Sequence, residues 1–346
     1  MISGGSVFSF RRAADEREEI AAYDVESGKS LWKHAYVAPF AMNQYATKMG
    51  PGPFATPLVH QGRVFTVGSS GVVTAVDART GKPVWASRPY PVNTKGNNFC
   101  GAAASPLIES GLLIVHLGDE FEAGLAGIDP ASGAIRWRHQ YDAPGYASPV
   151  AVELHGVRQI ITLTSKRAIS VNPADGTLLW SEPFPDEWIE NIVTPVRDGN
   201  RIIFSGVRRG TFAVEPRPEA GKWTVKPAWE NPEVTFYMSS PVLFEGKLYG
   251  FSSKKKGQIV VMDPAAGKLV WGAEGRGGEN AALVAAGQHL LALSDSGQLA
   301  VYRSGTPAPR EMAKYQVAAS QVWAHPAVTG RGVVIQSFTS LSYWTW

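Results

Sequence analysis

The chain has few of the features that would place it in a disulfide-rich, membrane-spanning or nucleic-acid-binding class. Its 346 residues include one cysteine, Cys100, so no intramolecular disulfide can form. No apolar run approaches the ~18 residues that a membrane helix needs, so we predict no membrane span. The net charge is only +3, which is too small to indicate a nucleic-acid partner. No helical periodicity is long enough to compete with β-structure.

Common catalytic and metal-binding motifs are also absent from the sequence. The seven histidines show no His-x-x-x-His spacing, so we predict no zinc site. There is no Gly-x-Ser-x-Gly nucleophile elbow and no phosphate-binding loop. On these grounds we assign no catalytic residue and no metal ligand.

The chain instead repeats one short phrase: Asp or Asn, then Gly four positions later, then Trp four positions after that. Repeats of roughly 40–50 residues indicate a propeller, a solenoid or an array. Between Trp180 and Asp263 a decayed copy is expected, in which either Trp223 or Trp229 replaces the repeat tryptophan, and Gln298–Tyr302 marks a later copy that has lost the phrase. The five intact copies are Asp24–Gly28–Trp32, Asp77–Gly81–Trp85, Asp129–Gly133–Trp137, Asn172–Gly176–Trp180 and Asp263–Gly267–Trp271.

Each repeat contains four short strand-like segments. A Ser/Thr-Pro step such as Thr56-Pro57 opens the first segment, and Gly-containing turns separate the alternating segments that follow. In the repeated phrase, Asp accepts hydrogen bonds from nearby backbone N–H groups, and Gly supplies the positive φ of a bulged hairpin. The Trp offers a large apolar face to an adjacent sheet. This pattern predicts antiparallel four-stranded sheets.

The fold predicted is all-β: a single propeller domain over residues 1–346, because a ring of blades buries both faces of each sheet. We prefer eight blades, and seven is the alternative if terminal strands combine into one blade. Ser6–Phe10 is interpreted as the second strand of a first blade that is incomplete at the N-terminus. We expect a monomer.

The repeats resemble the pyrroloquinoline-quinone (PQQ)-like propeller repeat, Ala-x-Asp-x-x-Thr-Gly-x-x-x-Trp, which is matched by Ala75–Trp85 and its sibling copies. The resemblance covers essentially the whole chain. Its members include quinoprotein alcohol and glucose dehydrogenases, the propeller lipoprotein of the outer-membrane β-barrel assembly machine, and exported proteins that are only PQQ-binding-like. The short single-domain build looks most like the last group.

The catalytic branch of that superfamily implies PQQ beside a vicinal disulfide, with Ca²⁺ held by Glu, Asn and Asp side chains. Cys100 alone cannot form such a disulfide, and the PQQ-stacking Trp and the Asp base cannot be placed on particular residues of this sequence. Glu190 with Asn191, or Glu279 with Asn280, could offer oxygens to Ca²⁺. PQQ with calcium therefore stays an alternative cofactor.

One face of the predicted propeller carries the loops that enter the innermost strands, and these loops are rich in amides, carboxylates and aromatics. Converging groups of this kind are typical of a small-ligand or peptide site. The alternative is that they plug the channel mouth and satisfy buried backbone groups. The candidates are Asn43, Tyr45, Asn98, Tyr146, Glu190, Asn191, Tyr237, Glu279, Asn280, Trp323 and His325.

Hairpins predicted on the same face are basic. Arg208, Arg209, Lys254 and Lys255 are expected to raise the local potential and attract an anion. Solvated hairpin tips are the alternative interpretation.

The leading functional hypothesis is a non-catalytic binding scaffold that holds a protein partner or a small anionic ligand on its loop-rich face. A PQQ- and calcium-dependent quinoprotein oxidoreductase is the first alternative, and a role like that of the assembly-machine lipoprotein is the second. No signal sequence is visible in the chain. We expect a periplasmic or secreted protein, on the interpretation that a segment precedes Met1.

Overall fold

The computed structural model describes residues 1–50, 52–90, 92, 100–119, 122–184, 186, 191–252, 254, 257–305 and 307–346. These residues form antiparallel strands and one short 3-10 helix, η1 (Thr47–Met49), which confirms the all-β prediction. None of the described helical structure is long and apolar enough to cross a membrane. The strands divide into two compact units, residues 1–153 with 157–184 and residues 154–156 with 185–346. Whether residues 1–346 act as a single domain stays a prediction.

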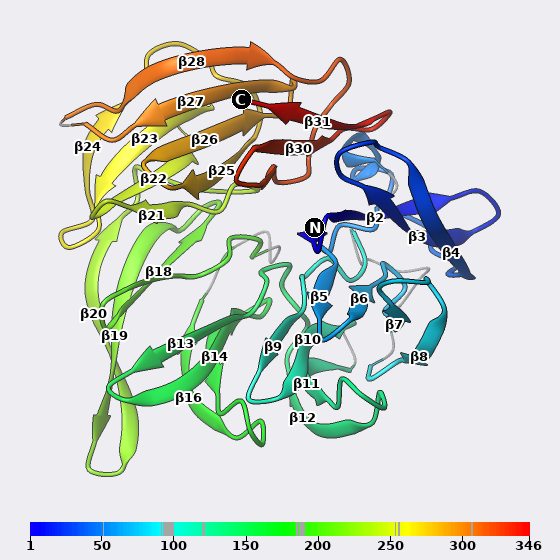
Figure 1. Cartoon of the computed structure of the whole chain (residues 1–346). Helices are drawn as coiled ribbons and strands as arrows, with labels where there is room; N and C mark the ends of the chain where they lie inside the picture. Colours follow the sequence, from blue (N-terminus) through cyan, green and yellow to red (C-terminus); the bar gives the residue numbers. More distant parts are fainter. Residues whose placement is uncertain are drawn as a thin grey trace. The chain divides into compact units, whose positions relative to one another are not determined.

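The first unit contains four sheets, each a meander of four strands in sequence order (Figure 1). Its first sheet is β1 (Ile2–Ser3), β2 (Ser6–Ala13), β3 (Arg17–Asp24) and β4 (Ser30–Val37). The second is β5 (Leu58–His60), β6 (Arg63–Val67), β7 (Val73–Asp77) and β8 (Pro83–Ser87). The third is β9 (Leu107–Glu109), β10 (Leu112–Gly118), β11 (Ala123–Ile128) and β12 (Ile135–Tyr141). The fourth is β13 (Val150–Leu154), β14 (Val157–Leu163), β15 (Arg167–Val171) and β16 (Leu178–Pro183).

The second unit contains three four-stranded sheets and one sheet of three strands. Its first sheet is β17 (Val196–Asp198), β18 (Arg201–Gly206), β19 (Gly210–Glu219) and β20 (Lys222–Asn231). The next is β21 (Val242–Phe244), β22 (Lys247–Ser252), β23 (Gln258–Asp263) and β24 (Lys268–Gly272). Then come β25 (Ala281–Ala286), β26 (His289–Ser294), β27 (Gln298–Arg303) and β28 (Arg310–Gln316). The last sheet is β29 (Ala327–Val328), β30 (Gly332–Gln336) and β31 (Leu341–Thr345).

Eight such sheets give the chain the fold of an eight-bladed β-propeller, as preferred from the sequence. The prediction that the first blade is the incomplete one is wrong. Ile2 and Ser3 pair with Val7 and Ser6 as its short first strand. The reversal is made by Gly4 and Gly5, whose φ values of 54° and 76° suit glycine. The sheet with three strands is the last one.

The Asp-x-x-x-Gly turn forms as predicted. In the second sheet, Asp77 Oδ1 accepts a hydrogen bond from the Thr80 backbone N–H at 2.8 Å, and the Gly81 N–H donates to Asp77 O at 2.8 Å. Gly81 has a φ of 70°, and a bulge lies between Ala75 and Val76 on the facing strand. Trp85 then pairs across from Ala75, which fixes the side to which its indole points.

The repeat tryptophan joins one sheet to the next within a unit. The Trp85 indole N–H donates to Pro130 O at 3.1 Å in the following turn. A Cβ added to Gly133 would lie 2.7 Å from the Trp85 ring, so this turn needs glycine for the close approach as well as for its φ. The same indole-to-turn hydrogen bond joins Trp32 to Ala78, Trp137 to Pro173 and Trp229 to Pro264.

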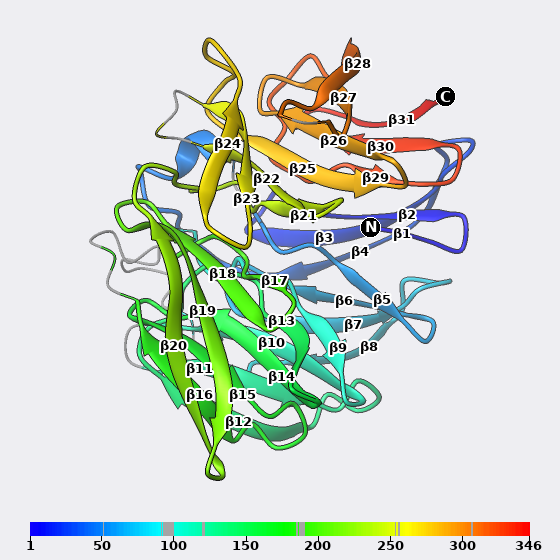
Figure 2. The ribbon, with the colours of Figure 1, turned by 90° about the vertical axis from the view of Figure 1, so that its left-hand side faces the viewer.

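The structure identifies the tryptophan of the decayed copy. Trp229 pairs across from Ala213 at the bulge, so it is the repeat tryptophan and Trp223 is not. The insertion lengthens β19 and β20 into a hairpin arm, in which residues 215–219 pair with residues 222–226. The arm extends beyond the end of β18, whose pairing with β19 starts at Ile202 and Val214 (Figure 2).

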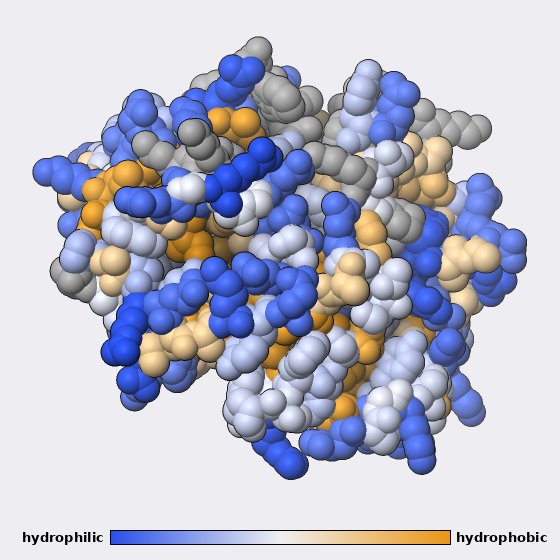
Figure 3. All heavy atoms as spheres, turned by 90° about the horizontal axis from the view of Figure 1, so that it is seen from above, coloured by the Kyte–Doolittle hydropathy of each residue, from blue (hydrophilic) through white to orange (hydrophobic). Residues whose placement is uncertain are grey.

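Apolar side chains of the inner strands fill the space between sheets. In the first unit, Val67, Val73 and Leu113 are fully buried in one such cluster, and each large buried aliphatic side chain contributes about 1.5–3 kcal/mol of transfer free energy. On the face seen in Figure 3, hydrophilic and hydrophobic side chains alternate over short distances.

Candidate functional site

In the first unit, the structure gives local roles to the predicted loop residues that it describes. Asn43 Oδ1 accepts a hydrogen bond from the Tyr45 backbone N–H at 2.9 Å, so this amide closes a turn of its own loop. The Tyr45 side chain is exposed. Tyr146 is half-buried, and its hydroxyl lies 3.4 Å from the backbone N of Cys100. Asn98 lies outside the described residues.

The second unit buries two of the predicted residues and half-buries a third. Asn280 is 6% exposed and accepts a hydrogen bond from the Ser239 hydroxyl at 2.5 Å. Ser239 also donates to Ala281 O, so the pair ties the start of β25 to the preceding sheet. Asn191 is buried with a φ of 25°. Trp323 is half-buried, and its buried indole N–H has no hydrogen-bond partner among the described residues.

The remaining loop candidates of the second unit are more accessible. Glu279 and His325 are exposed, and Tyr237 is half-buried. Glu190 lies outside the described residues. The structure therefore supports, for Asn43 and Asn280, the alternative that these amides satisfy groups of the fold itself.

The predicted basic hairpins are partly neutralised. Asp186 Oδ2 accepts the backbone N–H of Arg208 at 3.1 Å. The Arg209 guanidinium lies over the Phe212 ring, 3.8 Å from its centroid, and 3.3 Å from Glu230. These acids lower the positive potential that the sequence predicted for this hairpin.

Lys254 belongs to the neighbouring hairpin, and its Nζ donates to Pro232 O at 2.5 Å. Because Pro232 follows the strand that carries Glu230, the two hairpins lie beside one another at one end of this unit. Lys255 lies outside the described residues. The structure thus brings together Arg208, Arg209 and Lys254, which we call the basic hairpins.

A buried carboxylate in the first unit was not singled out from the sequence. Glu18 is fully buried and accepts hydrogen bonds from the Tyr36 hydroxyl at 2.8 Å and the Ser69 backbone N–H at 2.9 Å. The Arg12 guanidinium lies 3.3 Å away. Burial raises the pKa of the Glu18 carboxyl, and the hydrogen bond from Tyr36 and the charge of Arg12 offset part of that rise. Burial and the nearby Glu18 also raise the pKa of Tyr36.

This carboxylate ties the first sheet to the hairpin of the second. A Cβ on Gly68 would lie 2.0 Å from Glu18 Oε2, so the hairpin backbone can approach only as glycine. In the sequence Glu18 sits in an acidic segment that is typical of a solvated hairpin, and no local signal marks it as buried.

A second polar cluster of the first unit surrounds His116, which is 2% exposed. Its Nδ1 lies 3.0 Å from Ala147 O and 3.1 Å from the Thr162 hydroxyl. Burial lowers the pKa of His116 to about 4, so the ring is neutral at pH 7. His116 Nε2, the Tyr141 hydroxyl and Asp142 Oδ1 have no hydrogen-bond partner among the described residues.

Neither cluster forms a metal centre. Over the described ranges, no three His, Cys, Asp or Glu side chains lie close enough to hold a metal ion. The Asp142 carboxylate next to His116 is instead paired with Arg167, at 2.9 Å.

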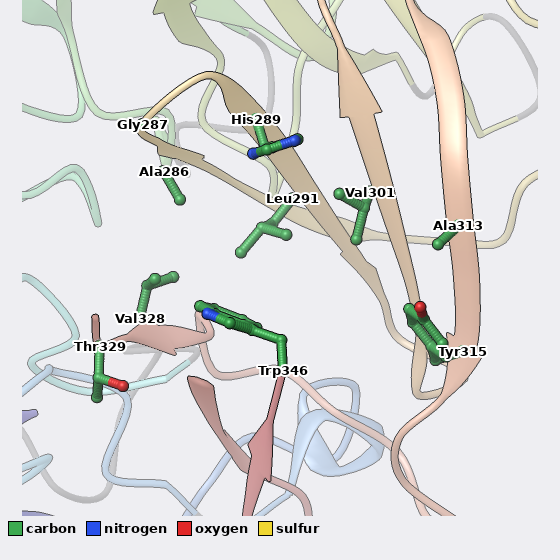
Figure 4. A pocket seen from close by; sticks show the side chains of 10 residues that line it. All are labelled: Ala286, Gly287, His289, Leu291, Val301, Ala313, Tyr315, Val328, Thr329 and Trp346. Carbon is green, nitrogen blue, oxygen red and sulfur yellow. The ribbon is translucent and has the colours of Figure 1, made fainter. Parts of the chain in front are cut away.

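A pocket that the sequence did not predict lies in the second unit, between the sheets β25–β28 and β29–β31. Its volume is about 530 Å³, and aliphatic and aromatic side chains dominate its lining. Leu291 and Trp346 point into it, with Val301 and Ala313 on one side and Val328 on the other (Figure 4). His289 is the lining residue with a basic side chain, and Thr329 and Tyr315 contribute hydroxyl groups.

The sequence was compared with models of protein families and with curated proteins. A family model described as outer membrane protein assembly factor BamB matches residues 16–273. A comparison with curated protein sequences gives no match.

Among solved structures, BamB from Moraxella catarrhalis aligns with a TM-score of 0.67 and 15% identity, over 99% of this chain and 98% of that one. The computationally designed Ika8 protein gives a TM-score of 0.67 at 13% identity, over 100% and 95% of the two chains. Quinohemoprotein alcohol dehydrogenase from Comamonas testosteroni gives 0.61 at 13% identity, over 93% of this chain and 69% of that one. At these identities the likeness concerns the fold.

Proposed function

Because this chain belongs to the family of outer membrane protein assembly factor BamB, we propose that it is a non-catalytic propeller scaffold that binds a protein partner in the periplasm. The partner would belong to outer-membrane protein assembly, as the family description indicates. The proposal favours a protein over the small anionic ligand that the sequence left open.

The observation that carries this choice is the solvent exposure of the basic hairpins. The Arg208 and Lys254 side chains are exposed on adjacent hairpins, and the exposed Glu230 carboxylate lies beside Arg209. A mixed-charge, solvent-facing surface suits the polar rim of a protein interface. A small anion would require a concave site with converging donors.

Site-specific photo-crosslinking in cells tests the proposal. A photoreactive phenylalanine analogue at position 208 or 254 should give a covalent adduct of one defined mass. The same analogue at position 197, an exposed arginine site on β17, is the matched control and should give none. Equal adducts from all three positions, or none from any, would contradict the proposal.

The quinoprotein alternative has its own test, a calorimetric titration with PQQ in the presence and absence of Ca²⁺. We expect no binding heat in either condition. Calcium-dependent binding with a Kd of about 1 μM or tighter would replace the scaffold proposal with an oxidoreductase.

A further inference from the structure

In each of the first three sheets a tyrosine follows the repeat tryptophan by four or five positions. These are Tyr36, Tyr90 and Tyr141. The Tyr36 hydroxyl donates to Glu18 Oε2 at 2.8 Å, and the Tyr90 hydroxyl donates to Leu125 O at 3.2 Å. The Tyr141 hydroxyl is also buried, but among the described residues it has no hydrogen-bond partner. The third tyrosine therefore differs from its two counterparts.

Two other buried polar atoms beside Tyr141 share this property. The Tyr141 ring meets the His116 ring edge-on, with the centroids 5.7 Å apart, and Asp142 follows Tyr141 in the chain. His116 Nε2 and Asp142 Oδ1 have no partner within the described part of the chain. Burial lowers the pKa of His116 to about 4 and raises that of Tyr141, and the nearby Asp142 charge acts on both groups.

The contacts of His116 define what its Nε2 can do. We assign the ring proton to Nδ1, because Nδ1 lies 3.0 Å from Ala147 O, which can only accept. The Thr162 hydroxyl donates to the same carbonyl at 3.1 Å. Since the ring is neutral at pH 7, Nε2 carries a free lone pair and is a hydrogen-bond acceptor.

The other two atoms supply one acceptor and one donor. Asp142 Oδ2 accepts a hydrogen bond from Arg167 Nε at 2.9 Å, which leaves Oδ1 as a second acceptor on the same carboxylate. The raised pKa of Tyr141 keeps its hydroxyl protonated, so the O–H is available as a donor. The cluster thus offers two acceptors and one donor, and each is costly to bury without a partner.

We propose that these three atoms form a buried binding site for one water molecule, which donates to His116 Nε2 and Asp142 Oδ1 and accepts from the Tyr141 hydroxyl. Water has the two donors and the acceptor that this set requires, and buried waters typically make about three such bonds. It would serve Tyr141 as Leu125 O serves Tyr90.

A metal cation fits the same atoms less well. The Asp142 carboxylate is already paired with Arg167, and the described ranges contain no group of three His, Cys, Asp or Glu side chains that could hold a metal. An anion would be repelled by Asp142 Oδ1. The neutral ligand is favoured by the charges as well as by the count of donors and acceptors.

The water would complete a polar connection between the third and fourth sheets of the first unit. His116 and Tyr141 belong to the third sheet, whereas Thr162 and Arg167, which bond to His116 and Asp142, belong to the fourth. This role is independent of the protein-binding proposal.

A crystal structure of the 346-residue protein, at a resolution that shows ordered waters, tests the site directly. We expect one water peak at about 2.6–3.2 Å from each of His116 Nε2, Asp142 Oδ1 and the Tyr141 hydroxyl. The absence of a peak there would overturn the proposal. A peak with the shorter distances of about 2.0–2.2 Å typical of a bound zinc ion would overturn it as well.

Urea denaturation of two matched variants gives a second, independent test. Tyr90→Phe removes a direct hydrogen bond and should raise the unfolding equilibrium constant about two- to tenfold. If a water bonds to Tyr141, Tyr141→Phe should raise the constant by a similar factor. A hydroxyl without any partner gives the opposite result, because its removal relieves a buried unsatisfied group. An unchanged or smaller constant for Tyr141→Phe would therefore contradict the bound water.

Discussion

The sheets β5–β8 and β25–β28 are built alike but joined to their neighbours differently. Both have four strands and a bulge at the same place between the third and fourth strands. The first carries Trp85, which reaches Pro130 and the Gly133 turn, whereas the second carries Ala313 and borders a pocket. The sheet without the repeated phrase still forms all its strands. The phrase therefore acts mainly as a joint between sheets, and strand alternation alone is enough to make each sheet.

Removal of a repeat tryptophan that joins two sheets should have the largest effect on stability. Trp85→Ala should lower the free energy of unfolding by about 3–5 kcal/mol, because it leaves a cavity and removes one of the two hydrogen bonds that Pro130 O accepts, the other coming from Arg63. Urea denaturation measures the change. Trp344→Ala, at an exposed position of the last sheet, should cost less than about 1 kcal/mol. Similar losses for the two variants would refute the distinction between joint and edge.

The second-largest loss of stability is expected when a side chain is added to the turn glycine that packs against a repeat tryptophan. Gly81→Ala adds a Cβ at a φ of 70° and 2.5 Å from the Trp32 ring, and should cost about 3 kcal/mol. Gly62→Ala is matched in φ, at 73°, but meets nothing within 4 Å, so it should cost only about 1–2 kcal/mol. The difference between the two thermal or urea transitions isolates the contact with tryptophan. No difference would mean that the glycine is needed for its φ alone.

The contribution of the buried Glu18 carboxyl to stability should depend on pH. Burial raises the pKa of this carboxyl in the folded state, so the folded protein holds the proton more tightly than the unfolded chain. Stability should therefore fall as pH rises from about 4.5 through the folded pKa, relative to Glu18→Gln, which does not titrate. Urea midpoints of the two proteins across that range measure the effect. Parallel curves would show that Glu18 titrates normally.

Restoring the missing tryptophan should have the smallest effect. Ala313→Trp places an indole into the pocket beside β28 and should raise the free energy of unfolding by about 1 kcal/mol. Differential scanning calorimetry measures the shift. A loss of more than about 1 kcal/mol would show that Trp346 already fills the space that an indole requires.

The turns and strands could be predicted because their causes are local. Asp77, Thr80 and Gly81 close their turn through contacts within five residues, so the repeated phrase was sufficient to place it. The strand Ile2–Ser3 could not be predicted from local sequence, because two residues are too few to show an alternating pattern. Local sequence also left Trp223 and Trp229 undecided, since only the register across Ala213 distinguishes them.

The candidate site was less accessible to sequence reasoning. Asn280 was singled out as a ligand-binding amide, yet its oxygen accepts a hydrogen bond from Ser239, in the loop that leads into the preceding sheet. Glu18 resembled a solvated acid, and its burial depends on a hairpin about fifty residues away. Ala313 falls at the tryptophan position only through the bulge between Val301 and Tyr302, which the pairing register shows and the sequence does not.

By itself, the sequence determined an all-β chain of repeated four-stranded sheets, because alternation, bulged turns and glycine φ act over a few residues. Only the tertiary structure decided which polar residues are buried, which sheet lacks a covering strand, and where an apolar pocket opens. Those properties depend on contacts between sheets, whose partners lie about 30–60 residues apart and leave no local trace in the chain.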